Sequence, residues 1–245
     1  MPITSAELKA YASLNMPEND TGVSGGGIDV NTLIEFTDMA ANDTVRAVST
    51  AAGDTMVCSV TGRTAAGAIV TDAITLAGTT PVAGTTVFER ILKVSLASAP
   101  AGAVTVERNV TPFTDIVVIP IGKTGVRRMF YNSSSQATAT VLYEKIFFKN
   151  ENATLTLTAA KTKLTADPST KIKIANAAAV NDTVSVANRL TVPAGTFVDD
   201  NVDAAVPGDA LAAGAAIGVW AEFSLAAGNA PIRSTFTVEL RGTTT

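Results

Sequence analysis

The segment Gly22-Val23-Ser24-Gly25-Gly26 matches G-x-S-x-G, a pattern that in many hydrolases holds a serine nucleophile on a sharp turn between a strand and a helix. Such a serine needs a histidine base, and the chain contains no histidine. A polar segment precedes the motif and a further glycine follows it, where a strand and a helix are required. The sequence therefore predicts a flexible hinge here and no nucleophile.

A second pattern, Gly122-Lys123-Thr124, resembles the end of a phosphate-binding P-loop, in which backbone N–H groups and a lysine surround phosphate oxygens. The first glycine of that motif would fall at Val117, and the residues after Thr124 have the pattern of a strand instead of a helix. Both requirements of the motif fail, so we predict a turn between two strands and no nucleotide site.

Carboxylates gather at Asp199, Asp200 and Asp203, with Asn201 among them, and such oxygen atoms are the ligands that Ca²⁺ prefers. The segment lacks the glycine and the closing glutamate of an EF-hand loop, so we interpret it as a solvated acidic loop. Over the whole chain we predict no catalytic, cofactor-binding or metal-binding residue, and no cofactor.

The histidine and cysteine counts exclude several kinds of site. Without histidine the chain has no Ser-His-Asp or Cys-His arrangement and no imidazole metal ligand. Cys58 is the single cysteine, so it forms neither an internal disulfide nor a thiolate zinc site. It falls on the apolar side of an expected strand, which favours a buried, inert thiol. Catalysis by carboxylates or lysine stays open, although no paired acidic motif supports it.

Arginines and aromatic rings alternate near the middle of the chain, where Arg127 and Arg128 precede Phe130 and Tyr131. On a strand one arginine and one ring would share each face. We expect the arginines to contact carboxylates, either Glu144 or those of a neighbouring subunit. Nucleic acid is a poor partner for them because the net charge of the chain is −4.

The composition favours a protein that acts through contacts with neighbouring subunits. Hydrophobic residues make up 47% of the 245 residues, but aromatic residues only 5% and charged residues 16%, where about a quarter charged is usual. Low charge indicates a surface rich in Thr, Ser and Ala or one covered by neighbouring subunits, and it favours an assembly component. Trp220 is expected in packing or at an interface, since a carbohydrate platform presents several rings. We expect neither a membrane span nor a secretory signal.

The residue pattern predicts an all-β fold. Residues 55–94 alternate apolar and small polar side chains between glycine-marked turns, with Met56, Cys58 and Val60 on one side of a strand. Residues 87–96 also match a helix start, but their β-branched neighbours favour a strand. The expected strands in the first half are 30–37, 44–49, 55–62, 69–76, 87–96, 103–108 and 116–119.

Alternation continues through the second half of the chain. Residues 126–131 and 141–149 are predicted to form a hairpin with its turn at 132–135. Each of three short segments is expected to have one buried and one solvated face, and these are 155–157, 172–174 and 184–186. Residues 198–211 are expected to form a polar loop with a helical turn near its end, and 217–225 is expected to pair with 236–240.

These strands are predicted to form two β-sandwich or jelly-roll-like domains, over 28–115 (immunoglobulin-like) and 116–245. Frequent Ala-Gly turns before about residue 110 and few after it suggest this boundary. Residues 1–27 are predicted to be an N-terminal arm with a short helix near 5–11 capped by Ser5. The arm either orders against a neighbouring subunit or is a disordered tail.

Three segments resemble virion structural proteins of tailed bacteriophages, and together they cover about half of the chain. The first, SVTGRTAAGAIVTDAITLAGTTPVAGTTVFERILKV, has a T-G-x-x-A-A-G turn, an acidic residue before I-T-L, G-T-T-x-V and a Phe-centred strand. Asp72 stands where glutamate is expected in this pattern. The other two segments are YEKIFFKNENATLTLTAAK and AAGAAIGVWAEFSL.

The resemblance implies a non-enzymatic decoration, or cement, protein on the outer surface of the capsid. Such proteins bridge subunits of the major capsid protein, often as homotrimers at three-fold positions, and they have no catalytic residues. A tail, fibre or head–tail connector component is the alternative within the same particle. A carbohydrate-binding adhesin and a carboxylate-dependent hydrolase are alternatives of other classes, and the scarcity of aromatic residues and of paired acidic motifs speaks against them.

Overall fold

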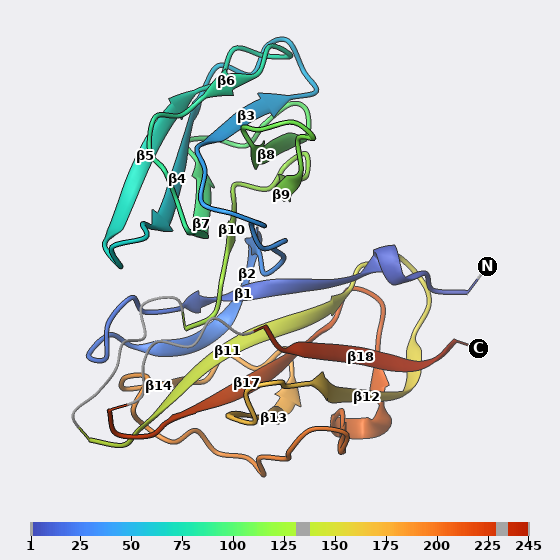
Figure 1. Cartoon of the computed structure of the whole chain (residues 1–245). Helices are drawn as coiled ribbons and strands as arrows, with labels where there is room; N and C mark the ends of the chain where they lie inside the picture. Colours follow the sequence, from blue (N-terminus) through green and yellow to red (C-terminus); the bar gives the residue numbers. More distant parts are fainter. Residues whose placement is uncertain (1, 131–137, 229–234, 245) are drawn as a thin grey trace. The chain divides into compact units, whose positions relative to one another are not determined.

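The computed structural model describes residues 2–130, 138–228 and 235–244, and strands dominate this part of the chain (Figure 1). The all-β prediction is confirmed. The helical segments of the described residues are two short 3₁₀ turns, η1 (Ser5–Glu7) and η2 (Pro207–Asp209). No helix in these ranges is long and apolar enough to cross a membrane.

The chain forms two compact units. Unit 1 consists of Met1–Asp29 and Met129–Thr245, and unit 2 of Val30–Arg128, so unit 2 is inserted into the sequence of unit 1. The expected boundaries at 27/28 and 115/116 differ from this division. The chain leaves unit 1 within β2 (Ser24–Leu33) and returns to it just after β10 (Gly125–Arg127).

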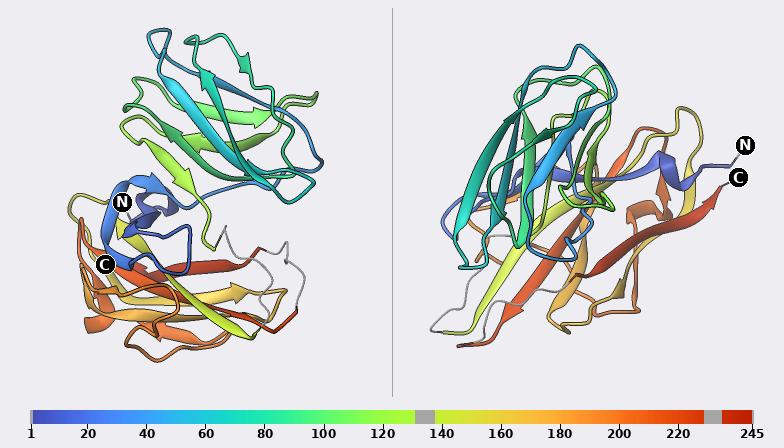
Figure 2. Two further views of the ribbon diagram at one scale, coloured as in Figure 1. Left: turned by 90° about the vertical axis from the view of Figure 1, so that its left-hand side faces the viewer. Right: turned by 45° about the horizontal axis from the view of Figure 1, so that its top comes forward.

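Unit 1 contains two sheets, which appear from two further directions in Figure 2. In the first, strands β13, β17, β11 and β1 follow one another, β2 begins beside β1, and β14 pairs with β2. In the second, β18 pairs with one edge of β12, and β15 and β16 pair with the other. The strands are β1 (Leu8–Asn15), β11 (Thr140–Asn150), β12 (Leu157–Ala166), β13 (Ile172–Val180), β14 (Ser185–Val186), β15 (Asp203–Ala205), β16 (Ala210–Leu211), β17 (Ala216–Leu225) and β18 (Thr237–Thr244).

The middle strands of the first sheet in unit 1 are buried on both faces. Every residue of β11 from Leu142 to Phe148 is buried, and so is β17 from Ala216 to Ala221. The two strands pair in continuous antiparallel register, with Lys145 opposite Trp220. Charged residues in β11 are therefore held inside the unit and need partners there.

Unit 2 also contains two sheets. One has the order β10-β7-β4-β5, with the end of β2 beside β10, and the other has the order β6-β3-β8-β9. The strands are β3 (Val45–Ser49), β4 (Val57–Arg63), β5 (Ile69–Thr75), β6 (Val82–Ala83), β7 (Arg90–Leu96), β8 (Val104–Arg108) and β9 (Asp115–Ile119). Cys58 and Val60 are fully buried on the predicted side of β4, and the ambiguous segment 87–96 is a strand over most of its length.

The structure corrects the interpretation of residues 1–27 as an arm. Strand β1 lies between β11 and β2, and Tyr11 and Ala12 on it are 0% and 1% exposed. The expected helix near 5–11 is reduced to η1, which Thr4 caps instead of Ser5. A helix of so few residues is marginal by itself, whereas a central strand buries Tyr11 and pairs with β11 from Ile146 to Asn150.

Two expected strand pairings are also wrong. Strand β10 pairs with β2 and β7, and β11 pairs with β1 and β17, so the predicted hairpin between them does not form. The predicted turn at 132–135 lies outside the described residues. Strand β17 pairs with β11 and β13 while β18 pairs with β12, and the expected polar loop at 198–211 contains β15, η2 and β16. Strands β10 and β11 are not neighbours in their sheet, and β17 and β18 belong to different sheets, which residue alternation cannot reveal.

Candidate functional site

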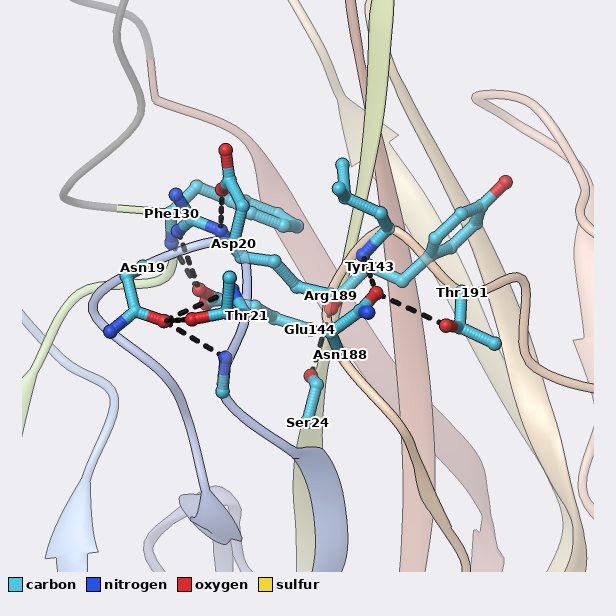
Figure 3. Close-up of polar contacts among 12 residues, drawn as sticks. Asn19, Asp20, Thr21, Ser24, Phe130, Tyr143, Glu144, Asn188, Arg189 and Thr191 are labelled. Atoms are coloured by element: carbon cyan, nitrogen blue, oxygen red, sulfur yellow. Dashed lines mark hydrogen bonds and ion pairs between the residues drawn. The ribbon is translucent and has the colours of Figure 1, made fainter.

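A buried network of charged groups joins three distant segments of unit 1 (Figure 3). Arg189 is 2% exposed and Glu144 is fully buried. The Nε atom of Arg189 donates to Oδ1 of Asp20 at 2.6 Å, and its Nη1 lies 3.7 Å from Oε1 of Glu144. The other carboxylate oxygen of Glu144, Oε2, accepts a hydrogen bond from the backbone N of Phe130 at 2.8 Å. One guanidinium thus lies between two carboxylates.

Backbone contacts place this network along the edge of β11. Strand β1 pairs with β11 only as far as Ile146. Beyond that point Tyr143 N donates to Arg189 O at 2.7 Å, and Ser24 Oγ donates to Tyr143 O at 2.8 Å. The segment around Arg189 and the first residue of β2 therefore cover the edge that β1 leaves open. Asn188 steadies this segment, because its Oδ1 accepts from Leu190 N and Thr191 Oγ1.

The G-x-S-x-G motif is part of this structure and is not the flexible hinge that the sequence predicts. Ser24 is fully buried, and its hydroxyl is the donor to Tyr143 O. Gly25 and Gly26 have φ values of +96° and +86°, so glycine is favoured at both positions. The motif starts strand β2, and its serine acts as a structural hydrogen-bond donor.

A second buried charge, Lys145, follows Glu144 on β11 and therefore lies on the opposite face of the strand. Its Nζ donates to Oδ2 of Asp182 at 2.7 Å and to Val184 O at 2.6 Å. The rings of Phe147 and Trp220 lie 5.2 and 5.1 Å from the ammonium group. Burial lowers the pKa of Lys145, and Asp182 opposes this shift. The lysine fastens residues 182–184 to β11.

A tyrosine and a glutamate lie on the same face of this sheet as Lys145. Tyr143 Oη donates to Oε2 of Glu222 at 3.3 Å across the β11–β17 pair. Burial, followed by the charge of Glu222, raises the pKa of Tyr143. The charged residues of β11 thus have internal partners on both faces of the strand, and these contacts hold residues 182–184 and Arg189 to the sheet.

The Gly122-Lys123-Thr124 motif and the acidic loop lie outside this network. Gly122, with φ of +77°, lies in the turn between β9 and β10, which confirms the predicted turn, and Lys123 Nζ donates to Val30 O at 2.9 Å. In the acidic loop, Asp203 pairs with Arg241 at 2.6 Å and with Lys161 at 3.5 Å. Within the described ranges no group of three or more Cys, Asp or Glu residues is placed to hold a metal ion.

The arginine pair lies in unit 2. Arg128 Nη2 donates to Oδ1 of Asp38 at 2.6 Å and its Nε donates to Ile91 O, so a carboxylate contact is present, although Asp38 supplies it. Arg127 is buried, and Tyr131 lies outside the described residues. Sequence reasoning proposed Glu144 as a partner for these arginines and missed Arg189.

Cys58, expected to be a buried and inert thiol, and Trp220, expected in packing or at an interface, are both buried. Cys58 is fully buried, and burial raises the pKa of its thiol to about 12, far from the range of a reactive thiolate. Trp220 is 2% exposed within β17, so it packs inside unit 1. The one indole ring is thus unavailable as an exposed platform for a sugar.

Each unit carries exposed apolar side chains. In unit 1 these include Leu14, Val184 and Val192, at 66%, 60% and 66% exposure. In unit 2 Ile121 is 65% exposed, and the half-exposed ring of Phe113 lies against the guanidinium of Arg46. Such side chains are contact points for other molecules when they gather on a surface that is poor in charge.

Comparison with known proteins gives no match: no protein family, no curated protein and no solved structure resembles this chain closely enough to be identified. Function is therefore inferred from the residues and contacts described above.

Proposed function

We propose that this chain is a non-enzymatic structural protein of a tailed-phage virion, which decorates the capsid and stabilises it by bridging subunits of the major capsid protein. The observation that carries the proposal is the way unit 1 uses its charged groups. Glu144, Lys145 and Arg189 are directed inward to fasten loops, while aliphatic side chains such as Leu14 and Val192 lie in solvent. Exposed aliphatic side chains on a surface poor in charge are suited to contact with other subunits where they gather.

The same internal ion pairs argue against catalysis as the role of the buried charges. Arg189 and Glu144 neutralise one another inside the unit, and Ser24 donates to a backbone carbonyl. The segments that resemble phage virion proteins include much of β4, β5 and β11, which belong to the structural frame of the two units. A structural role in assembly depends on strands of this kind.

Capsid stabilisation follows from surface burial and symmetry. Apolar surface removed from water contributes about 25 cal/mol per Å², so even a modest interface contributes several kcal/mol before the cost of association. Repetition over a shell multiplies that contribution, because neighbouring capsomers cannot separate without exposing each bridged surface. A homo-oligomer, with a trimer at three-fold positions favoured, would bridge several subunits at once.

The test is to count copies of the chain in purified particles of the phage that encodes it, by quantitative mass spectrometry, and to locate the chain by labelled electron microscopy. Several hundred copies on the shell are expected for a decoration protein. A few dozen copies at one vertex or on the tail would assign it to the connector or fibre instead. Absence from particles, or binding to a glycan array by the purified chain, would overturn the proposal.

A further inference from the structure

Strand β18, at the edge of the second sheet of unit 1, has one unused side. It pairs along its length with β12, from Leu157 opposite Thr244 to Ala166 opposite Thr237. In the part of the chain that the structure describes, β12 is its only partner strand, and the partners β15 and β16 lie across β12 from it. The outer edge of β18 thus presents backbone N–H and C=O groups at alternate residues.

The geometry of β18 is regular over all eight of its residues. The β12–β18 pair has two irregularities, between Thr158 and Lys161 and between Leu164 and Ala166, and in both the extra residue belongs to β12. Ala159 in the first has φ of +48°. The bulges therefore shorten β12 locally and leave β18 without a break.

Natural sheets protect an open edge with proline, lysine, bulges or very short strands. The sequence of β18, TVELRGTT, has no proline and no lysine and is rich in β-branched residues. Its apolar residues Val238 and Leu240 are only half-buried, although they face the same side as the buried Leu164 and Thr162 to which they are paired. The edge is thus open, regular and incompletely covered.

The order of side chains along β18 identifies its partner. We propose that β18 pairs antiparallel with β18 of a second copy of this chain, about a two-fold axis at Leu240. In that register Glu239 lies opposite Arg241 of the other copy, and Leu240 lies opposite itself. Val238 meets Gly242, and Thr237 meets Thr243.

The charges of this arrangement are complementary. Glu239 and Arg241 lie on the more exposed face of β18 and have opposite signs two residues apart, which is the spacing that self-pairing about Leu240 requires. In the single chain Arg241 reaches across β12 to Asp203, and in the paired sheets the contact with Glu239 of the other copy replaces it. The joined sheets bury both copies of Leu240 and form two cross-strand ion pairs, in a contact small enough to be concentration-dependent.

Cysteine cross-linking of the full chain tests the register. Leu240→Cys brings two thiols directly opposite one another, at a Cα separation of about 5 Å that a disulfide can span. Thr237→Cys is the matched control, because its two copies would lie about 20 Å apart. The native Cys58 is buried and contributes no background. We expect Leu240→Cys to form a covalent dimer under mild oxidation while Thr237→Cys does not.

Charge reversal tests the partner without a covalent bond. Glu239→Lys places a cation opposite Arg241 of the other copy, and we expect it to weaken self-association by about tenfold or more in light scattering over a concentration series. Glu35→Lys makes the same charge change at an exposed residue of unit 2, and it should leave association unchanged. A parent chain that stays monomeric over the series, equal cross-linking of the two cysteine variants, or association insensitive to Glu239→Lys overturns the inference.

The inference does not depend on the proposed function, because it is measured on the isolated chain. Self-association through β18 in a protein absent from virus particles would leave the β18 contact standing and remove the capsid role. A chain that stays monomeric but is abundant on the shell would support the capsid role and rule out the β18 contact.

Discussion

Gly25 lies so close to the indole ring of Trp220 that no side chain fits between them. An ideal Cβ on Gly25 would lie 2.5 Å from Cη2 of the tryptophan and 3.0 Å from Val184 O. Gly25 also has φ of +96°, a conformation that other residues adopt with strain. The glycine-rich start of β2 is therefore fitted to Trp220 at the centre of β17.

Gly25→Ala should destabilise unit 1 by about 2 to 4 kcal/mol, since it adds both overpacking and backbone strain. Gly214→Ala is the matched control, because Gly214 has φ of +74° with no atom within 4 Å of its Cβ position. Gly214→Ala should lower the free energy of unfolding by only about 1 kcal/mol. Trp220 is the single tryptophan, so denaturant unfolding followed by its fluorescence reports on unit 1. Equal losses of stability in the two variants would show that the indole ring of Trp220 moves aside without cost.

Lys145→Met should destabilise unit 1 by about 3 kcal/mol at neutral pH, because it leaves the carboxylate of Asp182 near the interior without its cation. Lys149→Met is the control: Lys149 lies 3.9 Å from Glu151 at the partly exposed end of β11, so its loss should cost less than about 1 kcal/mol. The double variant Lys145→Met/Asp182→Asn should recover part of the stability. Failure of the double variant to recover any would assign the effect to packing alone.

Lys145→Met also tests how the folding stability of unit 1 depends on pH. The pKa of Lys145 is lower in the folded chain than in the unfolded chain, so between these two values the unfolded state holds more protons. Stability contributed by this group therefore rises with pH across that window. The stability difference between the parent and Lys145→Met should grow as the pH rises from neutral toward about pH 10.5, the ordinary value for lysine. A constant difference over this range would contradict the lowered pKa.

The strands of unit 2 could be predicted because their alternation is simple. Cys58, Val60 and Ile74 face the core as a period of two requires, and the intervening residues are more exposed. Each of these strands has one buried face, so the pattern along the sequence and the pattern of burial coincide. Val184 is the counterexample in unit 1, where the same pattern predicted burial and the side chain is 60% exposed.

The buried network could not be assembled from the sequence. Asp20, Glu144 and Arg189 are far apart along the chain. Each is a charged residue of a type that usually lies on the surface. One signal was present: Glu144 and Lys145 interrupt the apolar run of β11, and charged residues inside such a run need buried partners. Identifying those partners requires the order of the strands, which depends on long-range pairing of β11 with β1 and β17.

Asp54 gives unit 2 a defined response to acid. Its carboxylate accepts hydrogen bonds from Ser49 Oγ, Ala101 N and Gly102 N at 2.6, 2.9 and 3.0 Å. These bonds, that from Ser49 first, lower the pKa of Asp54. Its contribution to stability is therefore complete above the unfolded-state pKa and is lost as pH falls through the lower folded-state pKa.

Asp54→Asn should make unit 2 less stable at neutral pH and bring its stability closer to that of the parent as the solution becomes more acidic than about pH 4. The buried thiol of Cys58 reports on unit 2, and its reaction with dithiodipyridine can be followed in acid as well as at neutral pH. Asp115→Asn, at an exposed residue of the same unit, should behave as the parent. A stability gap that persists unchanged in acid would show that the charge of Asp54 is irrelevant.

Deletion of residues 1–24 should unfold unit 1, because β1 is a central strand and its removal exposes the edge of β11 and the space around Tyr11. Tyr11→Ala is the milder variant and should cost about 3 to 5 kcal/mol, since the ring is fully buried and its hydroxyl bonds to Glu151. The emission of Trp220 should shift to the red in the deletion, while Cys58 in unit 2 stays protected. Deletion of residues 1–3, which keeps the Thr4 cap and all of β1, is the control and should change neither probe. If the longer deletion leaves Trp220 buried and its unfolding midpoint unchanged, the segment is a dispensable arm after all, and the burial of Tyr11 contributes nothing to unit 1.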